Sequence, residues 1–403
     1  MTAKRIDRDY PSSNNFSAVK RRKDLDFPHE TTLEDDDGGA INLLSLLLQC
    51  AEYVATDHLP EASTLLSEIS EICSPFGSSP ERVVAYFAQA LQARVISSYL
   101  SAACAPLSDS PLQSQRIFAA LQTFNSVSPL IKFSHFTANQ AIFEALDGED
   151  SVHIIDLDVM QGLQWPGLFH ILASRRQKLR SIRITGFGPS SDLLASTGRR
   201  LSDFAASLSL PFEFHPIEGK IGNVSHQLGT RPGEAVVVHW MHHGLYDVTG
   251  SDLDTLEIIQ RLKPNLITMV EQELSCYDDG GSCFLGRFVE ALHYYSALFD
   301  ALGDGLGEES GERFTVEQIV FGTEIRNIVG GKRRMVMRWK EELSRVGFRP
   351  VSLRGNPATQ AGLLLGMLPW SGYTLVEENG ALRLGWKDLS LLNASAWQPQ
   401  PSD

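Results

Sequence analysis

The chain has 403 residues, 43% of them hydrophobic, and a formal net charge of −14 at pH 7. This hydrophobic fraction supports a full core in one large domain or two, whereas the acidic balance excludes a chain that binds polyanions through its whole surface, because non-specific DNA binding depends on clustered Lys and Arg. The sequence contains no apolar run of about 18 residues, so no membrane-spanning helix is expected. The amino-terminal residues lack the apolar segment of a secretory signal.

Residues 1–39 are polar with few large apolar side chains, and this composition predicts a disordered tail. The tail contains an acidic run from Glu34 to Asp37, which is interpreted as a solvated linker, and a basic run of four residues, Lys20, Arg21, Arg22 and Lys23. In a flexible tail the basic run is a candidate nuclear-import signal. An ordinary solubilising tail is the alternative.

Residues 40–146 show helical periodicity almost throughout and predict a mainly helical cap subdomain. Apolar side chains recur every three or four residues in its first helix, and these are the candidates for partner binding: Leu43, Leu44, Leu47, Leu48 and Ala51. The spacing Leu43-x-x-Leu46-Leu47 in this helix resembles a motif that docks in coregulator grooves, although ordinary core packing is the preferred interpretation. Further helices are predicted from Thr56-Asp57, from Ser79 to about Ala103, and over Leu112–Phe124 and Phe133–Leu146.

A buried parallel strand is predicted near the start of residues 147–403, because Val152, Ile154, Ile155 and Leu157 form an almost unbroken apolar run. A polar turn and a helical pattern from Trp165 follow, as in the first half of a βαβ unit. Such units place ligand sites at the carboxyl ends of their strands. The polar residues expected at that end are Asp156, Asp158, Gln161 and Gln164.

Strand and helix patterns alternate over the rest of the chain. Strands are predicted at 181–186, 211–216, 235–240 and 266–270, and helices at 168–174, 191–209, 253–262, 284–302, 315–329 and 339–346. Near the end, Asn379-Gly380 between two β patterns indicates a hairpin, since both residues tolerate positive φ. The predicted fold class is α/β: a methyltransferase-like Rossmann core over residues 147–403 with an N-terminal helical cap, by analogy of layout.

The residues of this core argue against chemistry with a bound cofactor. A methyltransferase needs a glycine-rich turn after its first strand, but the turn from Asp158 to Gly162 is bulky, and no carboxylate ends the second strand at Thr185–Gly188. We therefore expect no cofactor and no binding of S-adenosylmethionine.

The sequence gives equally little support for a metal-binding site or for an acid–base catalytic site. Three histidines, His239, His242 and His243, could bind zinc, but no Cys or carboxylate is spaced to complete a site. The five cysteines are scattered without a CxxC pair, which favours a reduced intracellular protein. Glu271 and Glu273 would share one face of a strand, yet no nucleophile or base is identifiable beside them. We assign no catalytic, cofactor-binding or metal residue; the alternative is an enzyme that uses a small molecule in the crevice from Asp156 to Gln164.

Two short motifs carry a family resemblance. The first is VHIID, at Val152, His153, Ile154, Ile155 and Asp156, and the second is SAW, at Ser395, Ala396 and Trp397. With the leucine-rich segments that flank the first motif, the chain resembles the GRAS family of plant transcriptional regulators over about residues 40–400, and its longer runs are similar to the Scarecrow branch. The PFYRE region of the family is matched only loosely, so no residue role follows from it.

The resemblance implies a transcription factor or co-regulator of plant tissue patterning, including endodermis and bundle sheath, that acts in the nucleus without a membrane partner. It implies a heterodimer with a Short-root-like protein through the caps, and zinc-finger transcription factors that bring the complex to promoter DNA. Asp156 is expected to hold a local loop. Two basic clusters are candidates for direct DNA contact, with solvated surface as the preferred alternative: Arg175, Arg176, Lys178 and Arg180, and Lys332, Arg333 and Arg334.

Overall fold

The computed structural model describes residues 34–100, 111–224, 228–274, 284–307, 309–330, 339–368 and 371–401. Residues Ala40–Asp403 form one compact unit, distinct from Met1–Gly39. The basic run at Lys20–Lys23 and the tail predicted around it lie outside the described residues, apart from the first residues of helix α1. The subdomain boundary predicted after residue 146 stays a prediction, because the compact unit continues across it.

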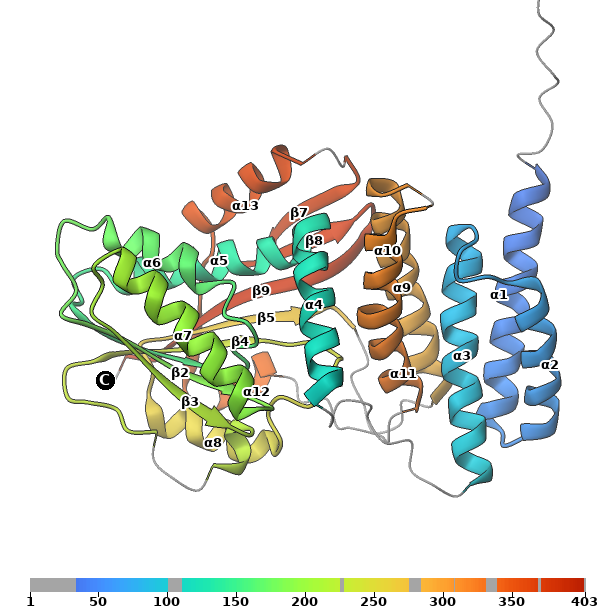
Figure 1. Ribbon diagram of the computed structural model, residues 1–403, viewed down its shortest axis with the longest axis horizontal. Coiled ribbons are helices and arrows are strands. Elements are labelled where there is room, and N and C mark those ends of the chain that lie inside the picture. The colour runs from blue at the N-terminus through green and yellow to red at the C-terminus, as the bar shows by residue number, and fades with distance from the viewer. Residues whose placement is uncertain are drawn as a thin grey trace, which may run out of the picture. The chain divides into compact units, whose positions relative to one another are not determined.

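In the described residues, five helices precede the first strand, each close to its predicted position (Figure 1). They are α1 (Glu34–Ala55), α2 (Leu59–Ile72), α3 (Ser79–Tyr99), α4 (Pro111–Val127) and α5 (Pro129–Ala145). A capping box fixes the start of α3, where the backbone N–H of Ser78 donates to Glu81 Oε2 at 2.7 Å. At α5, the Oγ of Ser128 accepts from the backbone N–H of Leu130, and Pro129 occupies the first turn.

One side of α1 is buried inside the compact unit. Leu47, Cys50 and Ala51 have no exposed surface, and Leu43 exposes 8%. By length and composition, Gly38–Ala55 could also cross a membrane, which the sequence analysis did not anticipate. Core helices pass the same test, and the burial of one apolar side fits a helix packed within the protein.

The described strands form one mixed sheet in the order β3-β2-β1-β4-β5-β9-β8-β7, with β6 paired to β9 outside this path. The first five strands are parallel: β1 (Ser151–Asp156), β2 (Ser181–Gly188), β3 (Phe212–Glu218), β4 (Ala235–Met241) and β5 (Leu266–Gln272). Helices α6 (Trp165–Ala173), α7 (Ser191–Ser207) and α8 (Asp252–Leu262) connect them. Strand β1 lies between β2 and β4, so the VHIID motif occupies the middle of the parallel sheet.

The antiparallel end of the sheet contains elements that the sequence analysis missed. The predicted hairpin is present as β7 (Tyr373–Glu378) and β8 (Ala381–Trp386), with Asn379 and Gly380 at φ 52° and 81°. Strand β9 (Leu389–Pro399) then enters between β8 and β5, antiparallel to both. Strand β6 (Phe348–Val351) and helix α13 (Asn356–Gly366) were also not predicted. This strand order completes the methyltransferase-like Rossmann fold that the sequence predicted.

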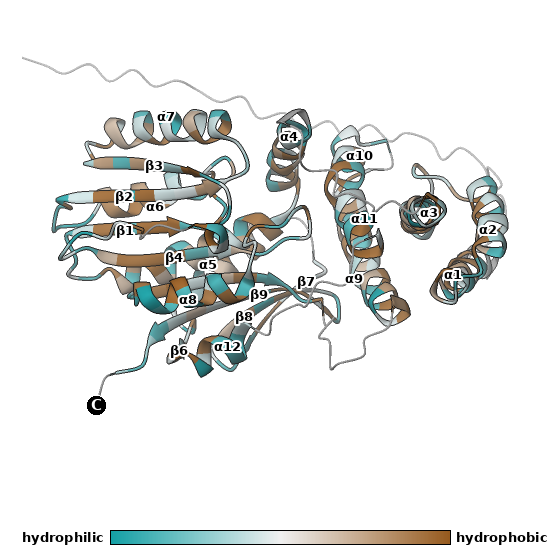
Figure 2. Cartoon of the chain, turned by 90° about the horizontal axis from the view of Figure 1, so that it is seen from below, coloured by the Kyte–Doolittle hydropathy of each residue, from teal (hydrophilic) through white to brown (hydrophobic). Residues whose placement is uncertain are grey.

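Two apolar cores lie on opposite faces of the sheet, because successive side chains of a strand point to opposite sides. Ile154 belongs to the larger core with side chains of α5, α6 and α7. Ile155 belongs to the smaller one, with α8 and α12 (Trp339–Arg345). Figure 2 shows β3, β2, β1 and β4 side by side, with apolar segments along the strands.

A second group of helices joins the sheet to the first three helices (Figure 1). It consists of α9 (Phe284–Gly305), α10 (Gly311–Val316), a π-helical segment (Glu317–Phe321), and α11 (Gly322–Gly330). The sequence predicted one uninterrupted helix over 315–329, whereas the structure inserts the π-helical turn. Both α9 and α11 pack against α3, so the helical region is built from two distant parts of the chain.

Candidate functional site

A cavity of about 110 Å³ lies at the carboxyl ends of β1, β4 and β5, where ligand sites of this fold class occur. The loop from β1 to α6 forms one side, and α4, α5, α9, the π-helical segment and α11 supply the others. Its wall is mostly apolar, with Phe124, Leu130, Val159, Leu298 and Phe321 among the contributors. The four polar residues predicted at this edge all line it: Asp156, Asp158, Gln161 and Gln164.

Asp156 ties together the turn that follows β1. Its Oδ1 accepts from the backbone N–H of Asp158 at 3.2 Å, and its Oδ2 accepts from the indole N–H of Trp165 at 2.9 Å. Burial, with the neighbouring Asp158 charge, raises the pKa of Asp156 to about 7. The Asp156 carboxyl group therefore holds the loop between β1 and α6, the local role expected of it, and it also lines the cavity.

Asp158 is held from the opposite side by the segment after β4. Its Oδ2 accepts from the Tyr246 hydroxyl at 2.6 Å and lies 3.0 Å from His243 Nε2. Its other oxygen, Oδ1, is buried without a hydrogen-bond partner. Burial and the Asp158 carboxylate raise the pKa of Tyr246 well above 10, so the phenol stays a donor at neutral pH.

Glu324 brings a third buried carboxyl group to the cavity from α11. It accepts from the backbone N–H of Gly244 at 2.9 Å, from Gln272 Nε2 at 3.1 Å and from the Tyr295 hydroxyl at 3.0 Å. Burial raises its pKa. Neither Glu324 nor Tyr246 was predicted from the sequence, because Glu324 shares its helix with other polar residues, among them Arg326 and Asn327, and so does not stand out.

The loop after β1 packs closely against the end of β2. The backbone N–H of Val159 donates to the carbonyl of Phe187 at 2.9 Å, which closes the loop after β1 over the end of β2. A Cβ added to Gly186 would lie 2.9 Å from Val159 Cγ1, so the valine side chain packs directly on this strand. No residue after Gly186 in β2 lines the cavity, which lies toward β4 and β5 instead.

The three histidines at the carboxyl end of β4, His239 within it and His242 and His243 just after it, do not converge on one point. His239 is buried and bonds through Nδ1 to Thr268 at 2.9 Å, while His242 stacks on Trp240 with ring centroids 3.8 Å apart. His243 bonds to Asp158. Among the described residues no group of three or more His, Cys, Asp or Glu side chains could hold a metal ion.

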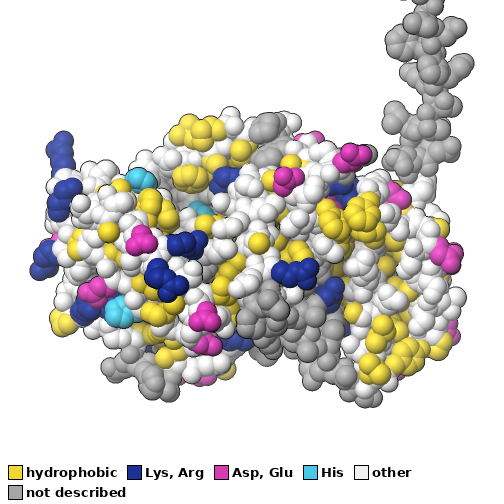
Figure 3. Space-filling view, in the orientation of Figure 1, with side chains coloured by type: hydrophobic (Ala, Val, Ile, Leu, Met, Phe, Trp, Pro, Cys, Tyr) yellow, Lys and Arg dark blue, Asp and Glu magenta, His cyan; other side chains and the backbone are white. Residues whose placement is uncertain are grey.

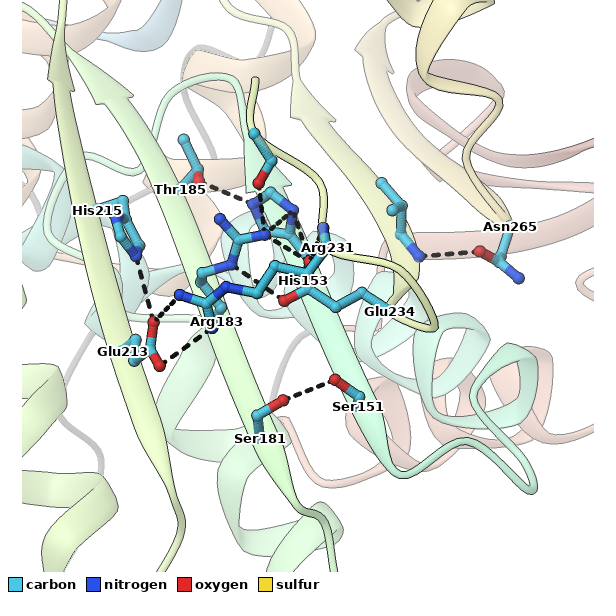
Figure 4. A network of polar contacts seen from close by, with 12 residues as sticks. Ser151, His153, Ser181, Arg183, Thr185, Glu213, His215, Arg231, Glu234 and Asn265 are labelled. Carbon is cyan, nitrogen blue, oxygen red and sulfur yellow. Dashed lines mark hydrogen bonds and ion pairs between the residues drawn. The ribbon is translucent and has the colours of Figure 1, made fainter. Parts of the chain in front are cut away.

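The histidine of VHIID belongs to a separate polar network within the sheet (Figure 4). His153 has no exposed surface; its Nε2 lies 2.8 Å from Thr185 Oγ1, and its Nδ1 lies 3.1 Å from an Arg183 guanidinium nitrogen. Arg183 in turn forms an ion pair with Glu234 at 2.5 Å. Burial beside Arg183 lowers the pKa of His153 to about 4, so the network joins strands around a neutral imidazole.

The SAW residues lie in β9 and are buried between neighbouring strands. Ala396 pairs with Thr268 of β5, and Trp397 pairs with Ile267. The Trp397 indole donates to Ser395 Oγ at 3.1 Å and packs in the smaller core with Trp339.

The candidate partner helix and the basic clusters are placed as follows. Leu43, Leu47 and Ala51 are buried in the chain itself, and Leu44 and Leu48 are half-buried. In the first basic cluster, Arg180 forms a two-pronged ion pair with Asp150 at 2.8 Å, and Arg175 lies 4.0 Å from Asp147. The second cluster, Lys332, Arg333 and Arg334, lies outside the described residues.

These features define a Rossmann-like α/β protein whose sheet edge is covered by helices, and the GRAS domain family matches residues 43–398. The chain belongs to the GRAS family and is a Scarecrow-like plant transcription regulator with a developmental role. It is 83% identical to Scarecrow-like protein 23 of Arabidopsis thaliana over all of both chains. It is 55% identical to Protein SCARECROW of Arabidopsis thaliana, covering 96% of this chain and 59% of that protein.

A solved structure shows the same fold. The crystal structure of SCL7 in Oryza sativa matches with a TM-score of 0.74 and 33% identity, and covers 88% of this chain and 99% of that one. The chain spans about half the length of the Scarecrow proteins of Arabidopsis thaliana and Ipomoea nil, at 59% and 51%.

Proposed function

We propose that this chain is a nuclear co-regulator that catalyses no reaction, pairs with a Short-root-like GRAS protein, and reaches promoter DNA mainly through zinc-finger transcription factors. The proposal includes a role in patterning of endodermis and bundle sheath. The observation that carries it is the full-length 83% identity to Scarecrow-like protein 23 within a family of transcription regulators.

Charge supports an indirect route to DNA. The net charge is −14, and in the first basic cluster Arg180 and Arg175 lie beside Asp150 and Asp147 of the same chain. An arginine paired within the protein neutralises fewer phosphates, and each neutralised phosphate contributes about 0.9 to the slope of log affinity against log salt. We expect the isolated protein to bind promoter DNA near a non-specific level of about 10⁻⁴–10⁻⁶ M at physiological salt.

The helical region supplies the surface that we assign to the Short-root-like partner. Leu44 and Leu48 lie one turn apart on α1 and are half-buried, so they remain accessible beside the buried Leu47. Figure 3 shows separate patches of hydrophobic side chains on the visible face of the region that contains α1–α3. An aliphatic stripe of this kind suits another apolar helix.

The test is a mobility shift with purified partner, zinc finger and promoter DNA over a salt series. The double variant Leu44→Glu/Leu48→Glu should leave the complex while the zinc finger stays on its site. Leu253→Glu is the matched control, since Leu253 on α8 is 69% exposed. Leu47→Asp is unsuitable because Leu47 has no exposed surface and the variant would unfold.

Two results would refute the proposal. One is nanomolar, sequence-selective DNA binding by this protein alone. The other is loss of the salt slope after Lys332, Arg333 and Arg334 are changed to Ala, because in the proposed complex the zinc finger makes the phosphate contacts.

A further inference from the structure

The cavity at the carboxyl edge of the sheet carries features that partner binding does not use. Its volume is about 110 Å³, which approaches the cavity of about 150 Å³ that holds benzene in an engineered protein. Met160, Gln161 and Leu163 line it and are half-buried, so the loop between β1 and α6 gives access.

Two unpartnered acceptors mark the polar end of this cavity. The Asp158 side chain is 3% exposed, and its Oδ1 is buried without a hydrogen bond, although its Oδ2 accepts from Tyr246. Gln161 Oε1 is likewise buried without a partner. Buried polar atoms are nearly always paired, and an unpaired one costs about 1–3 kcal/mol. Both atoms are acceptors, so the missing group is a donor.

We propose that this cavity binds a small, uncharged, mostly hydrocarbon molecule of about one ring, whose hydroxyl donates a hydrogen bond to Asp158 Oδ1. The apolar wall provides the burial that drives binding of the ring, as at Phe124, Leu130 and Phe321. An anionic ligand is excluded because the unpartnered atoms at the polar end, Asp158 Oδ1 and Gln161 Oε1, are acceptors and would repel it.

A neutral hydroxyl fits better than an ammonium group. Asp158 Oδ2 already accepts from the Tyr246 hydroxyl and lies 3.0 Å from His243 Nε2, so two polar groups of the protein already contact this carboxyl group. Burial raises the pKa of Asp156 and of Glu324, which favours their uncharged forms in the same cavity. A buried cation would therefore find little net negative charge to offset the loss of its hydration.

The π-helical segment gives independent support for a binding role. Residues Glu317–Phe321 adopt the rare i→i+5 pattern, which occurs frequently at functional sites. This segment directs Val320 and Phe321 to the cavity, while Glu317 faces Arg82 of α3 at 3.1 Å. A ligand in the cavity would contact the sheet edge and this helical layer at once.

The experiment is a titration of the full-length protein followed by NMR of its methionine methyl groups. The probes are phenol, toluene as its nearly isosteric hydrocarbon, and cyclohexylamine as a cation. Met160 and Met241 line the cavity. Met367, which follows the last residue of α13 and is 75% exposed, is the reference signal. Phenol should shift the first two signals and leave Met367 unchanged, with an affinity about tenfold above that of toluene. This measurement needs no variant that could fail to fold.

Two variants sharpen the test. Asp158→Asn can still accept from Tyr246 while turning its amide donor toward the cavity, so the preference for phenol over toluene should disappear. Met160→Trp should abolish the phenol-dependent rise in melting temperature, whereas its control Met367→Trp should keep it. Unchanged Met160 and Met241 signals at millimolar phenol, equal binding of toluene or cyclohexylamine, or an intact preference in Asp158→Asn would each overturn the proposal.

Discussion

Asp156 illustrates how a single motif residue organises its surroundings. It follows four buried residues of β1 and receives hydrogen bonds from Asp158 and Trp165, which lie at the two ends of the connecting loop. Trp165 has no exposed surface and stacks edge-on against His239 at 5.5 Å. The conformation of the loop therefore depends on one buried carboxyl group and one indole.

Trp165→Phe should lower the free energy of unfolding by about 1–3 kcal/mol, because it leaves Asp156 Oδ2 without its donor. Trp165→Ala should cost about 3–5 kcal/mol through lost packing. The comparison is Trp397→Phe. The indole of Trp397 donates to the neutral Ser395 hydroxyl, so its loss should lower the free energy of unfolding by less. Urea denaturation measures all three; an equal loss for the two Phe variants would contradict the role given to Asp156.

His153 should make stability depend on pH. Its pKa is lowered from 6.5 to about 4 by burial and by Arg183, so between these values the unfolded chain binds more protons than the folded one. The contribution of His153 to stability is therefore present above pH 6.5 and is lost as the pH falls toward 4, by about 3 kcal/mol at most.

The measurement compares wild type with His153→Gln, which retains polarity at this position but does not titrate. The difference in unfolding free energy between the two proteins should shrink as the pH is lowered from 7 to 4. A difference independent of pH would show that His153 titrates normally in the folded protein, and a difference that grows as the pH falls would show that its pKa is raised there.

At the scale of elements, α7 packs so closely on β3 that there is no room for a side chain at Gly198. A Cβ added to Gly198 of α7 would collide with the ring of Phe214 on β3. The sequence analysis located both elements, because helix and strand periodicity are local properties. It did not locate β9, most of whose residues are buried and which pairs along one edge with β5, a strand far away in sequence.

Gly198→Ala should destabilise the protein by up to about 2 kcal/mol, since the overpacking cost of about 1–3 kcal/mol outweighs the gain in helix propensity of about 1 kcal/mol. Gly362→Ala in α13 is the matched control, because nothing lies within 4 Å of its added Cβ. That variant should be stabilised by up to about 1 kcal/mol. Denaturant midpoints at unchanged m-values decide the comparison; the same sign of change for both variants would exclude the packing argument.

At the scale of the whole molecule, the helical region and the sheet share their packing. Helix α5 lies against β5 and β9, and α3 packs on α11. Arg82 of α3 lies 3.1 Å from Glu317 of the π-helical segment, with 3% and 0% of the two side chains exposed. Removing one partner of such a buried ion pair strongly destabilises a protein, because the other charge is left buried without compensation.

Deletion of residues 40–146 should therefore yield an insoluble product rather than an isolated Rossmann core. It would expose the faces of α9 and α11 that α3 covers and remove α5 from the sheet. Deletion of residues 1–33 should leave the melting temperature unchanged. Soluble yield and gel filtration measure both; a folded monomer of residues 147–403 would show that the core is independent.

Nuclear accumulation should fall when Lys20, Arg21, Arg22 and Lys23 are changed to Ala in a fluorescent fusion, because a nuclear-import receptor reads clustered positive charge. These residues lie outside the compact unit Ala40–Asp403, and we expect the melting temperature to stay the same. Four Ala substitutions in the acidic run Glu34–Asp37 serve as the control. An unchanged nuclear signal would assign import to another segment or to a partner.

By itself, the sequence determined the α/β class, most helices and strands, the family, and the presence of Asp156, Asp158, Gln161 and Gln164 at one sheet edge. These properties follow from periodicity and from the rule that parallel strands end at the same edge. The tertiary structure decided which groups face one another there. Glu324 reaches the cavity and Tyr246 reaches Asp158 from segments separated by many residues, and Val159 packs on Gly186 of β2. Such contacts depend on the crossing of distant elements, which no local pattern of residues encodes.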